Sequence, residues 1–350
     1  LNALVKDLGV NSRFYLSLLG ALLLQPRCLI LDEQSAFLDL DERKQLYTNL
    51  KKAAQDGMNI IVITHSKAEA TTYCDTITVL QKGALVAHYD RAAAFAESTP
   101  AVPLFANGAA CAELPATHSP CFELNHASCA PKNRPSLLDA TLRVDYGSIT
   151  AVSGMKEAAM DTLEDLVCGL QTEDARGSAC FYAKSGASYP LNLARGMLTM
   201  AFLRKHKTAV VPSDKTFRAS NPRLTIEQLL TVYAHSRRSA ASYAQSLIEQ
   251  AGVRITSAEK AAHLSGGMLQ RLILARELAT EPDFIILCNP LQGLDIQAQT
   301  DMIRTIVQLA KGGKAVLLAG AADFPLSLCT RVYTLESGVC TLSFTKEAAA

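Results

Sequence analysis

The feature that most constrains the fold is a repeat within the chain. Residues 27–39 (RCLILDEQSAFLD) and residues 283–295 (DFIILCNPLQGLD) each hold a short apolar run that leads into a polar turn. In both places a predicted helix, an apolar strand (Ile60–Thr64 or Ala315–Ala319) and finally a glycine turn follow. Such self-similarity indicates an internal duplication. The first copy lacks a front half, whereas the second copy is expected to be complete.

Helices alternate with strands in both copies. Residues 14–24 and Asp41–Gln55 have helical patterns, and Asn59–Thr64 is a β-branched run typical of a strand that is buried on both faces. Alternation of this kind predicts an α/β fold with a parallel sheet that helices cover on both sides.

Three zones follow along the chain. We expect the first copy over residues 1–92, a linker over 93–135 and the second copy over 136–350, because the middle zone is rich in Ala, Pro, Ser and Cys and has no periodicity. The linker holds zinc-type ligands without paired C-x-x-C spacing, so a loose linker is favoured over a metal site: Cys111, His118, Cys121, His126 and Cys129.

Composition excludes some classes of function. A length of 350 residues has room for about two domains. The net charge of +1 argues against a nucleic-acid partner, which favours a concentrated basic surface. We find neither a membrane span nor a secretory signal in the sequence, so a membrane role would require partner subunits. The ten scattered cysteines then indicate a reducing cytoplasm.

The strongest local motif is HLSGGMLQR at residues 263–271, which leads into a predicted helix over Leu272–Ala279. Backbone N–H groups and the helix dipole favour an anion at such a helix start, and glycine lets a phosphate approach closely. An N-cap followed by a glycine turn would explain Ser265 alone. It would not explain the duplicated strand-and-turn unit that follows.

The sequence Leu264-Ser265-Gly266-Gly267 resembles the signature motif of ATP-binding-cassette (ABC) ATPases. Residues 274–279, 293–295 and 211–215 are similar to the second cassette of tandem importers for simple sugars and nucleosides. This resemblance covers nearly the whole chain except the linker, and it implies tandem cassettes of the P-loop NTPase fold with the first incomplete. It also implies ATP and Mg²⁺ as cofactors, transmembrane permeases and a solute-binding protein as partners, and a peripheral location on the cytoplasmic face of the cell membrane.

The same resemblance implies roles for residues of the first cassette. Leu29–Glu33 is similar to the Walker B motif, in which Asp32 would hold Mg²⁺ through water and Glu33 would act as the catalytic carboxylate on the attacking water. Ser35–Asp39 is similar to the D-loop, through which Asp39 would reach the other cassette. His65 takes the place of the switch histidine that contacts the γ-phosphate.

The second cassette departs from the family pattern. A phosphate loop G-x-x-x-x-G-K-[ST] that starts at Gly154 would need Gly, Lys and a hydroxyl where Ala159–Asp161 reads Ala, Met, Asp. A lysine that could hold phosphate oxygens is therefore lost, and the aspartate would repel them. The Walker B acids are replaced by Cys288–Asn289, and the switch position holds Ala321.

The altered motifs all belong to one of the two expected ATP sites. In the family, each ATP lies between the Walker motifs of one cassette and the signature of the other. The first cassette's signature position, Leu8–Ser12, is altered as well, so one composite site keeps its motifs and the other loses them. We expect one hydrolysing site and one structural site. Because residues 1–31 contain no phosphate loop, we expect the chain to be a carboxy-terminal fragment or a mis-started gene product.

Three functions stay open. An ABC importer motor for a nucleoside, a simple sugar or riboflavin is favoured, and Asn289-Pro290 favours nucleosides. The absence of a first phosphate loop would suit a non-hydrolysing remnant or regulatory partner. A soluble tandem cassette of the translation-factor type is disfavoured, because such proteins keep the acids in both cassettes and join them by a charged helical linker.

Overall fold

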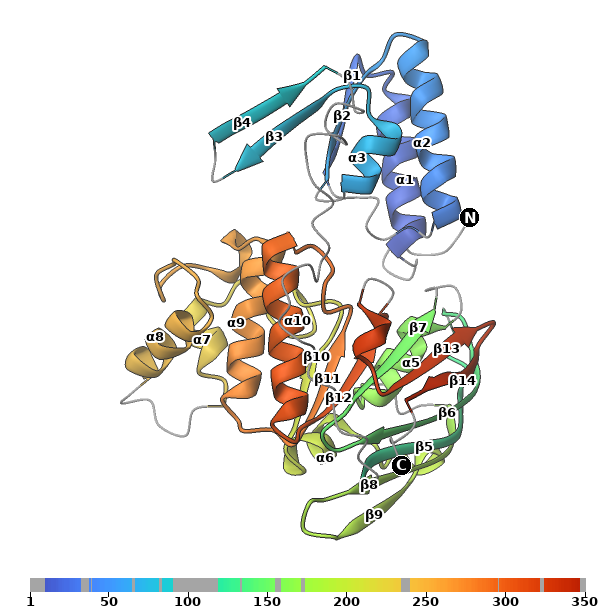
Figure 1. Cartoon of the computed structure of the whole chain (residues 1–350), viewed down its shortest axis with the longest axis vertical. Helices are drawn as coiled ribbons and strands as arrows, with labels where there is room; N and C mark the ends of the chain where they lie inside the picture. The colour runs from blue at the N-terminus through green and yellow to red at the C-terminus, as the bar shows by residue number, and fades with distance from the viewer. Residues whose placement is uncertain are drawn as a thin grey trace. The chain divides into compact units, whose positions relative to one another are not determined.

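The computed structural model describes residues 10–32, 38, 40–64, 67–81, 84–90, 119–132, 134–154, 159–170, 174–233, 240–294, 296–321 and 324–346. The chain divides into two compact units, Leu1–Ala110 and Cys111–Ala350, and each is described by itself (Figure 1). Over the described ranges, every helix is too short or too polar to cross a bilayer.

The carboxy-terminal unit contains a ten-stranded sheet with the order β10-β11-β12-β7-β13-β14-β6-β5-β8-β9. Neighbours from β10 to β13 are parallel, and the other pairs are antiparallel except β14 with β6. The strands are β5 (Pro120–Cys129), β6 (Leu137–Asp145), β7 (Ile149–Gly154), β8 (Ala175–Tyr182), β9 (Ser188–Asn192), β10 (Thr208–Val211), β11 (Phe284–Cys288), β12 (Ala315–Ala319), β13 (Arg331–Glu336) and β14 (Val339–Thr345). The helices are α5 (Met160–Val167), α6 (Met200–Lys205), α7 (Ile226–Leu230), α8 (Ala240–Gln250), α9 (Gly266–Leu278) and α10 (Ile296–Lys311).

Apolar side chains cover both faces of the parallel part of this sheet. Along β11, Ile285 and Leu287 face a core shared with α7, α8, α9 and α10, whereas Ile286 and Cys288 face a second core shared with α5, β5, β6 and β8. Every residue of β11 and β12 is buried. The predicted α/β fold is therefore confirmed in this unit, and the parallel strands are buried on both faces. Helices were predicted to cover both faces, and this is wrong for the second face, where β5, β6 and β8 share the cover with α5.

The amino-terminal unit is smaller. It consists of α1 (Val10–Leu23), β1 (Cys28–Asp32), α2 (Leu40–Gln55), β2 (Asn59–Ile63), α3 (Lys67–Tyr73), β3 (Ile77–Gln81) and β4 (Ala84–Tyr89). β1 and β2 form one parallel pair, and β3 and β4 form a separate antiparallel hairpin. Burial on both faces of residues 59–64 was predicted, and this is wrong: Ile61 and Ile63 are 50% and 47% exposed, because the described core residues of this unit pack against the opposite face of the strand.

The internal repeat extends to the strand register. β1 and β2 pair Cys28 with Asn59, and β11 and β12 pair Phe284 with Ala315 at the same sequence offset. The helices α2 and α10 begin and end at that offset as well, and α1 and α9 begin at it.

The linker predicted over 93–135 is wrong for residues 120–129, which form β5 within the large sheet. The strand escaped the periodicity argument because its alternation is interrupted. His126 has a left-handed backbone (φ 47°), and the pairing with β6 shifts register between Leu124 and Ala127. Cys121 and Cys129 are buried in this strand, while Cys111 and His118 lie outside the described residues.

Candidate functional site

The carboxyl ends of β11, β12 and β7 meet at one edge of the large sheet. β12 lies between the other two and is parallel to both, so Cys288, Ala319 and Gly154 end neighbouring strands. Ligand sites of α/β sheets occur at this kind of edge. The helix α5 follows β7 there, and it corresponds to the helix that the phosphate-loop pattern predicts.

The start of α5 keeps a backbone feature of a phosphate loop but not its side chains. Ala159, at the position of the second loop glycine, has φ 74° and ψ 24°, a left-handed conformation that favours glycine. Ala159 is fully buried and Met160, at the lysine position, is 2% exposed. Gly154 also has a packing role, because a Cβ there would overlap the carbonyl oxygen of Leu335. A buried thioether at the lysine position does not fit Mg²⁺–ATP.

The end of β11 carries thiol and amide groups in place of carboxylates. The Cys288 thiol is fully buried, 3.8 Å from the thiol of Cys168, and this contact and burial raise its pKa. Asn289 has a left-handed backbone (φ 46°), and its N–H donates to the carbonyl of Ala319 at 2.8 Å. A neutral buried thiol is a poor ligand for Mg²⁺, which prefers oxygen.

A buried carboxylate that sequence reasoning missed lies in α5. Glu164 is 2% exposed and accepts hydrogen bonds from the Ser213 N–H (2.8 Å) and the Ser213 hydroxyl (3.0 Å). Desolvation raises the pKa of Glu164, although both hydrogen bonds oppose that rise. The sequence signal was an acidic residue within an apolar helical pattern.

The four residues of the predicted signature lie together at the start of α9. Ser265 is the N-cap, and its hydroxyl accepts from the Met268 N–H at 3.3 Å. Gly266 is exposed, with no atom within 4 Å of a Cβ placed on it, whereas a Cβ on Gly267 would lie 3.1 Å from the Leu294 side chain. The first N–H groups of a helix have no intrahelical acceptor. This helix start, which Leu264 precedes, therefore fits an anion.

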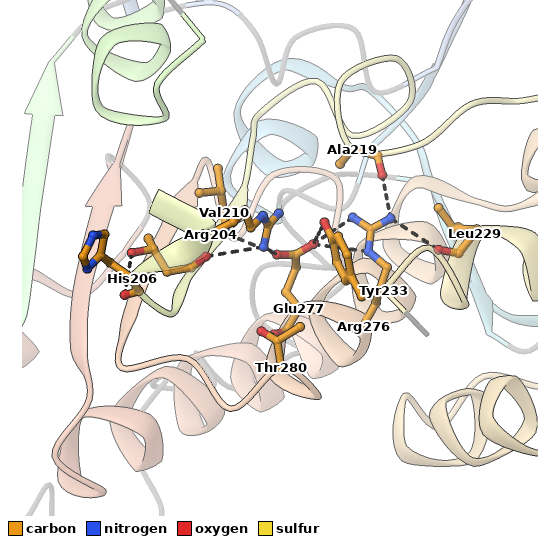
Figure 2. A network of polar contacts seen from close by, with 10 residues as sticks. Arg204, His206, Val210, Ala219, Leu229, Tyr233, Arg276, Glu277 and Thr280 are labelled. Carbon is orange, nitrogen blue, oxygen red and sulfur yellow. Dashed lines mark hydrogen bonds and ion pairs between the residues drawn. The ribbon is translucent and has the colours of Figure 1, made fainter. Parts of the chain in front are cut away.

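The other end of α9 is held by a polar network (Figure 2). Glu277 is fully buried, and its carboxylate accepts from Arg204, from Arg276 at 2.9 and 3.2 Å, and from the Tyr233 hydroxyl at 3.2 Å. The Val210 N–H adds a donor at 3.3 Å. The network therefore fixes α9 to α6, to β10 and to the segment after α7. An Arg-Glu pair within an apolar helix was the available sequence signal.

In the amino-terminal unit the structure describes one of the predicted catalytic-site residues. Asp32 ends β1, pairs in register with Ile63 and is exposed. Glu33, Asp39 and His65 lie outside the described residues. Searched over the described positions, the chain shows no group of three His, Cys, Asp or Glu side chains that could hold a metal ion.

Comparison with known proteins agrees with this architecture. Residues 139–292, which include the signature and the altered phosphate loop, match the family model described as ABC transporter. A dimeric ATP-binding cassette solved in a post-hydrolysis state with ADP and Pi superimposes with a TM-score of 0.52 at 17% identity, over 65% of this chain and 99% of that one. The chain has the fold of an ABC-transporter ATPase. A nucleotide-free ATP-binding cassette gives the same picture, with a TM-score of 0.50 at 17% identity over 65% of this chain and 93% of that one.

Several proteins to which this chain is similar are import ATP-binding proteins. The chain is 27% identical to the probable riboflavin import ATP-binding protein RfuB of Treponema pallidum and 25% identical to the ribose import ATP-binding protein RbsA 2 of Rhizobium meliloti. Each alignment covers 95% of this chain but only 64% and 65% of the relative. The chain therefore spans a little under two thirds of the length of these relatives.

Proposed function

We propose that the chain acts as the ATP-binding and ATP-hydrolysing subunit of an ABC importer for a small solute, a nucleoside, simple sugar or riboflavin. The observation that carries this proposal is the start of α9, where the exposed Gly266 and the capped Ser265 leave helix N–H groups open to a phosphate. The match of residues 139–292 to ABC transporters and the relatives for riboflavin and ribose import support it.

Two cassettes would form two unequal sites. The first would combine Asp32, Glu33 and His65 with the signature at residues 264–267, and Asp39 would contribute from the D-loop. There, Asp32 would hold Mg²⁺ through water, and Glu33 would accept a proton from the attacking water. ATP would supply the phosphoryl group whose transfer to water drives transport.

The second site would be structural. Met160 is buried where a lysine would reach phosphate, and Cys288 is a buried thiol where a carboxylate would hold water around Mg²⁺. These two side chains also favour a second candidate, a non-hydrolysing regulatory partner, if the first site proves inactive as well. In either case we propose that the chain is peripheral, on the cytoplasmic face of the membrane, bound to permease subunits that work with a solute-binding protein.

The Gly266→Ala variant tests the proposal in the assembled transporter. A methyl group at this open position leaves the fold intact, but it fills the space that a phosphate needs, so ATP turnover should fall at least about 10-fold. Gly20→Ala is the matched control, since Gly20 lies within α1 and also has open space around it. Equal turnover in the two variants would contradict a role for the α9 start in ATP hydrolysis.

A further inference from the structure

The turn between β11 and α10 has the sequence NPLQGL at residues 289–294, which contains no acidic residue. Asn289 and Gly293 have left-handed backbones there, with φ 46° and 71°. Leu294 is 2% exposed, and its N–H donates to the Leu291 carbonyl at 3.3 Å. The turn therefore places backbone carbonyls inside the protein, where a carbonyl without a hydrogen-bond donor is costly.

Two glutamine side chains supply donors to this turn. The Nε2 group of Gln270, in the second turn of α9, donates to the Pro290 carbonyl. The Nε2 group of Gln299, in the first turn of α10, donates to the Leu294 carbonyl at 3.1 Å and lies 3.5 Å from the Leu291 carbonyl. The turn is therefore fastened to both α9 and α10.

The same turn packs against the start of α9. A Cβ added to Gly267 would lie 3.1 Å from the Leu294 side chain, so this leucine lies against the Gly267 backbone. Gln270 follows Gly267 by three residues, and residues with this spacing are neighbours on the surface of a helix. The turn thus contacts α9 at two neighbouring points, directly after Ser265 and Gly266, where the helix start fits an anion.

The contact made by Gln299 is common to both copies of the repeat. At the sequence offset that relates the two copies, Gln299 corresponds to Arg43 and Leu294 corresponds to Leu38. The Arg43 guanidinium donates to the Leu38 carbonyl at 3.2 Å. A side-chain donor from the helix that follows the turn is therefore a general feature of this repeated unit.

The contact made by Gln270 is different. At the same offset Gln270 corresponds to Phe14, which is buried in the apolar core of the amino-terminal unit. Gln270 is itself only 2% exposed, and among the described residues its Oε1 atom has no hydrogen-bond partner. Burial of a partly satisfied amide is unfavourable, so packing alone does not account for a glutamine at this position. The tie between α9 and the turn belongs to the unit that keeps the signature at residues 264–267.

We propose that Gln270 is a positioning residue for the phosphate-binding start of α9, and that the acid-free turn after β11 serves as its brace. Gln270 holds the turn through the Pro290 carbonyl, and Leu294 of the turn supports Gly267. The helix start is then ordered before a phosphate arrives, so that binding costs less conformational entropy. The proposed function enters only in the identity of the anion as a phosphate of ATP.

Gln270→Met tests the brace, because methionine keeps the length of the side chain and removes the donor. In the 350-residue chain, the Met268 and Leu294 amides should exchange hydrogen at least about 10-fold faster than in the wild type, relative to the Ile273 amide in the middle of α9. Gln308→Met is the matched control, since it makes the same change at an exposed position of α10 and should leave these rates unchanged. Gln270→Leu gives the same reading if the methionine variant does not fold.

ATP hydrolysis by the assembled transporter tests the positioning role. Gln270→Met should raise the KM for ATP at least about 5-fold and lower kcat by less than about twofold, because the helix start must be ordered each time ATP binds. A purely structural role would reduce the amount of folded protein, which lowers the apparent kcat and leaves KM unchanged.

Two results would overturn the inference. The first is exchange at Met268 and Leu294 that rises no more than exchange at Ile273 in the Gln270→Met variant. The second is an unchanged KM for ATP in that variant. Failure of the proposed function has a separate signature, because it appears as equal turnover in Gly266→Ala and Gly20→Ala and leaves the hydrogen-exchange result as it is.

Discussion

Replacement of Glu277 by alanine removes the anion that holds the carboxyl-terminal end of α9. The carboxylate is fully buried and receives donors from Arg204, Arg276, Tyr233 and the Val210 backbone (Figure 2). A negative charge near the carboxyl end of a helix is opposed by the helix dipole. The donors therefore offset an unfavourable placement of the carboxylate. In the wild type, two arginines surround one carboxylate, so the cluster carries one net positive charge.

The magnitude follows from what stays behind. Arg276 has a side chain that is only 6% exposed, and in the variant its guanidinium keeps the carbonyls of Ala219 and Leu229 as partners but loses the carboxylate. Removal of one partner of a buried ion pair costs about 3–5 kcal/mol. For a unit of this size each kcal/mol lowers the Tm by about 2–4 °C, which gives a fall of about 6–20 °C.

Calorimetry of the 350-residue chain measures this effect on the transition of the carboxy-terminal unit. The control is Asp301→Ala, which removes an exposed pair with Arg304 (3.1 Å) and should change the free energy of unfolding by less than about 1 kcal/mol. A Glu277→Ala transition shifted no further than that of Asp301→Ala would refute the view that the network holds α9.

Two further predictions concern the edge of the sheet. Glu164→Gln should stabilise the protein at neutral pH, because burial raises the pKa of Glu164 and its charged form is disfavoured, while an amide oxygen can still accept from Ser213. In the wild type the unfolding free energy should fall as pH rises from the ordinary glutamate range through the raised pKa of Glu164. Urea titrations at a series of pH values should show a flatter dependence of this free energy on pH for the variant. Parallel pH dependences of the two proteins would contradict a raised pKa at Glu164. Gly320→Ala should cost about 2–4 kcal/mol, because Gly320 has φ 69° and a Cβ would overlap the Asn289 side chain. The control Gly312→Ala should cost less than about 1 kcal/mol in the same denaturation assay, since an added Cβ at that position meets only ordinary contacts. Equal losses of unfolding free energy in the two variants would contradict the view that a Cβ at residue 320 is strained.

The repeated strand-and-turn unit predicted the α/β architecture, because period and composition are sufficient to identify buried parallel strands. The sequence also located the four residues at the start of α9 and the loss of lysine at Met160. What it missed depends on tertiary context. The bulge at His126 hides the strand β5 from a periodicity argument. The burial of a strand such as β2 also depends on the layers packed against it, and among the described residues β12 is covered on both faces whereas β2 is covered on one.

The polar interior was beyond local pattern as well. Glu277 and Arg276 are adjacent in sequence, but their partner Arg204 comes from a helix more than seventy residues earlier. Similarly, Glu164 is satisfied by Ser213, forty-nine residues away. Such pairs are set by how helices pack on the sheet, so a single sequence indicates the buried charge without naming its partner.

The central claim, one hydrolysing site and one structural site, is tested most directly by ATP hydrolysis in the assembled transporter. Glu33→Gln should lower turnover at least about 100-fold while ATP still binds, because a positioned base is lost. Asn289→Ala should change turnover by less than about twofold, because the end of β11 has no catalytic carboxylate to lose. An Asn289→Ala loss as large as that of Glu33→Gln would contradict the claim.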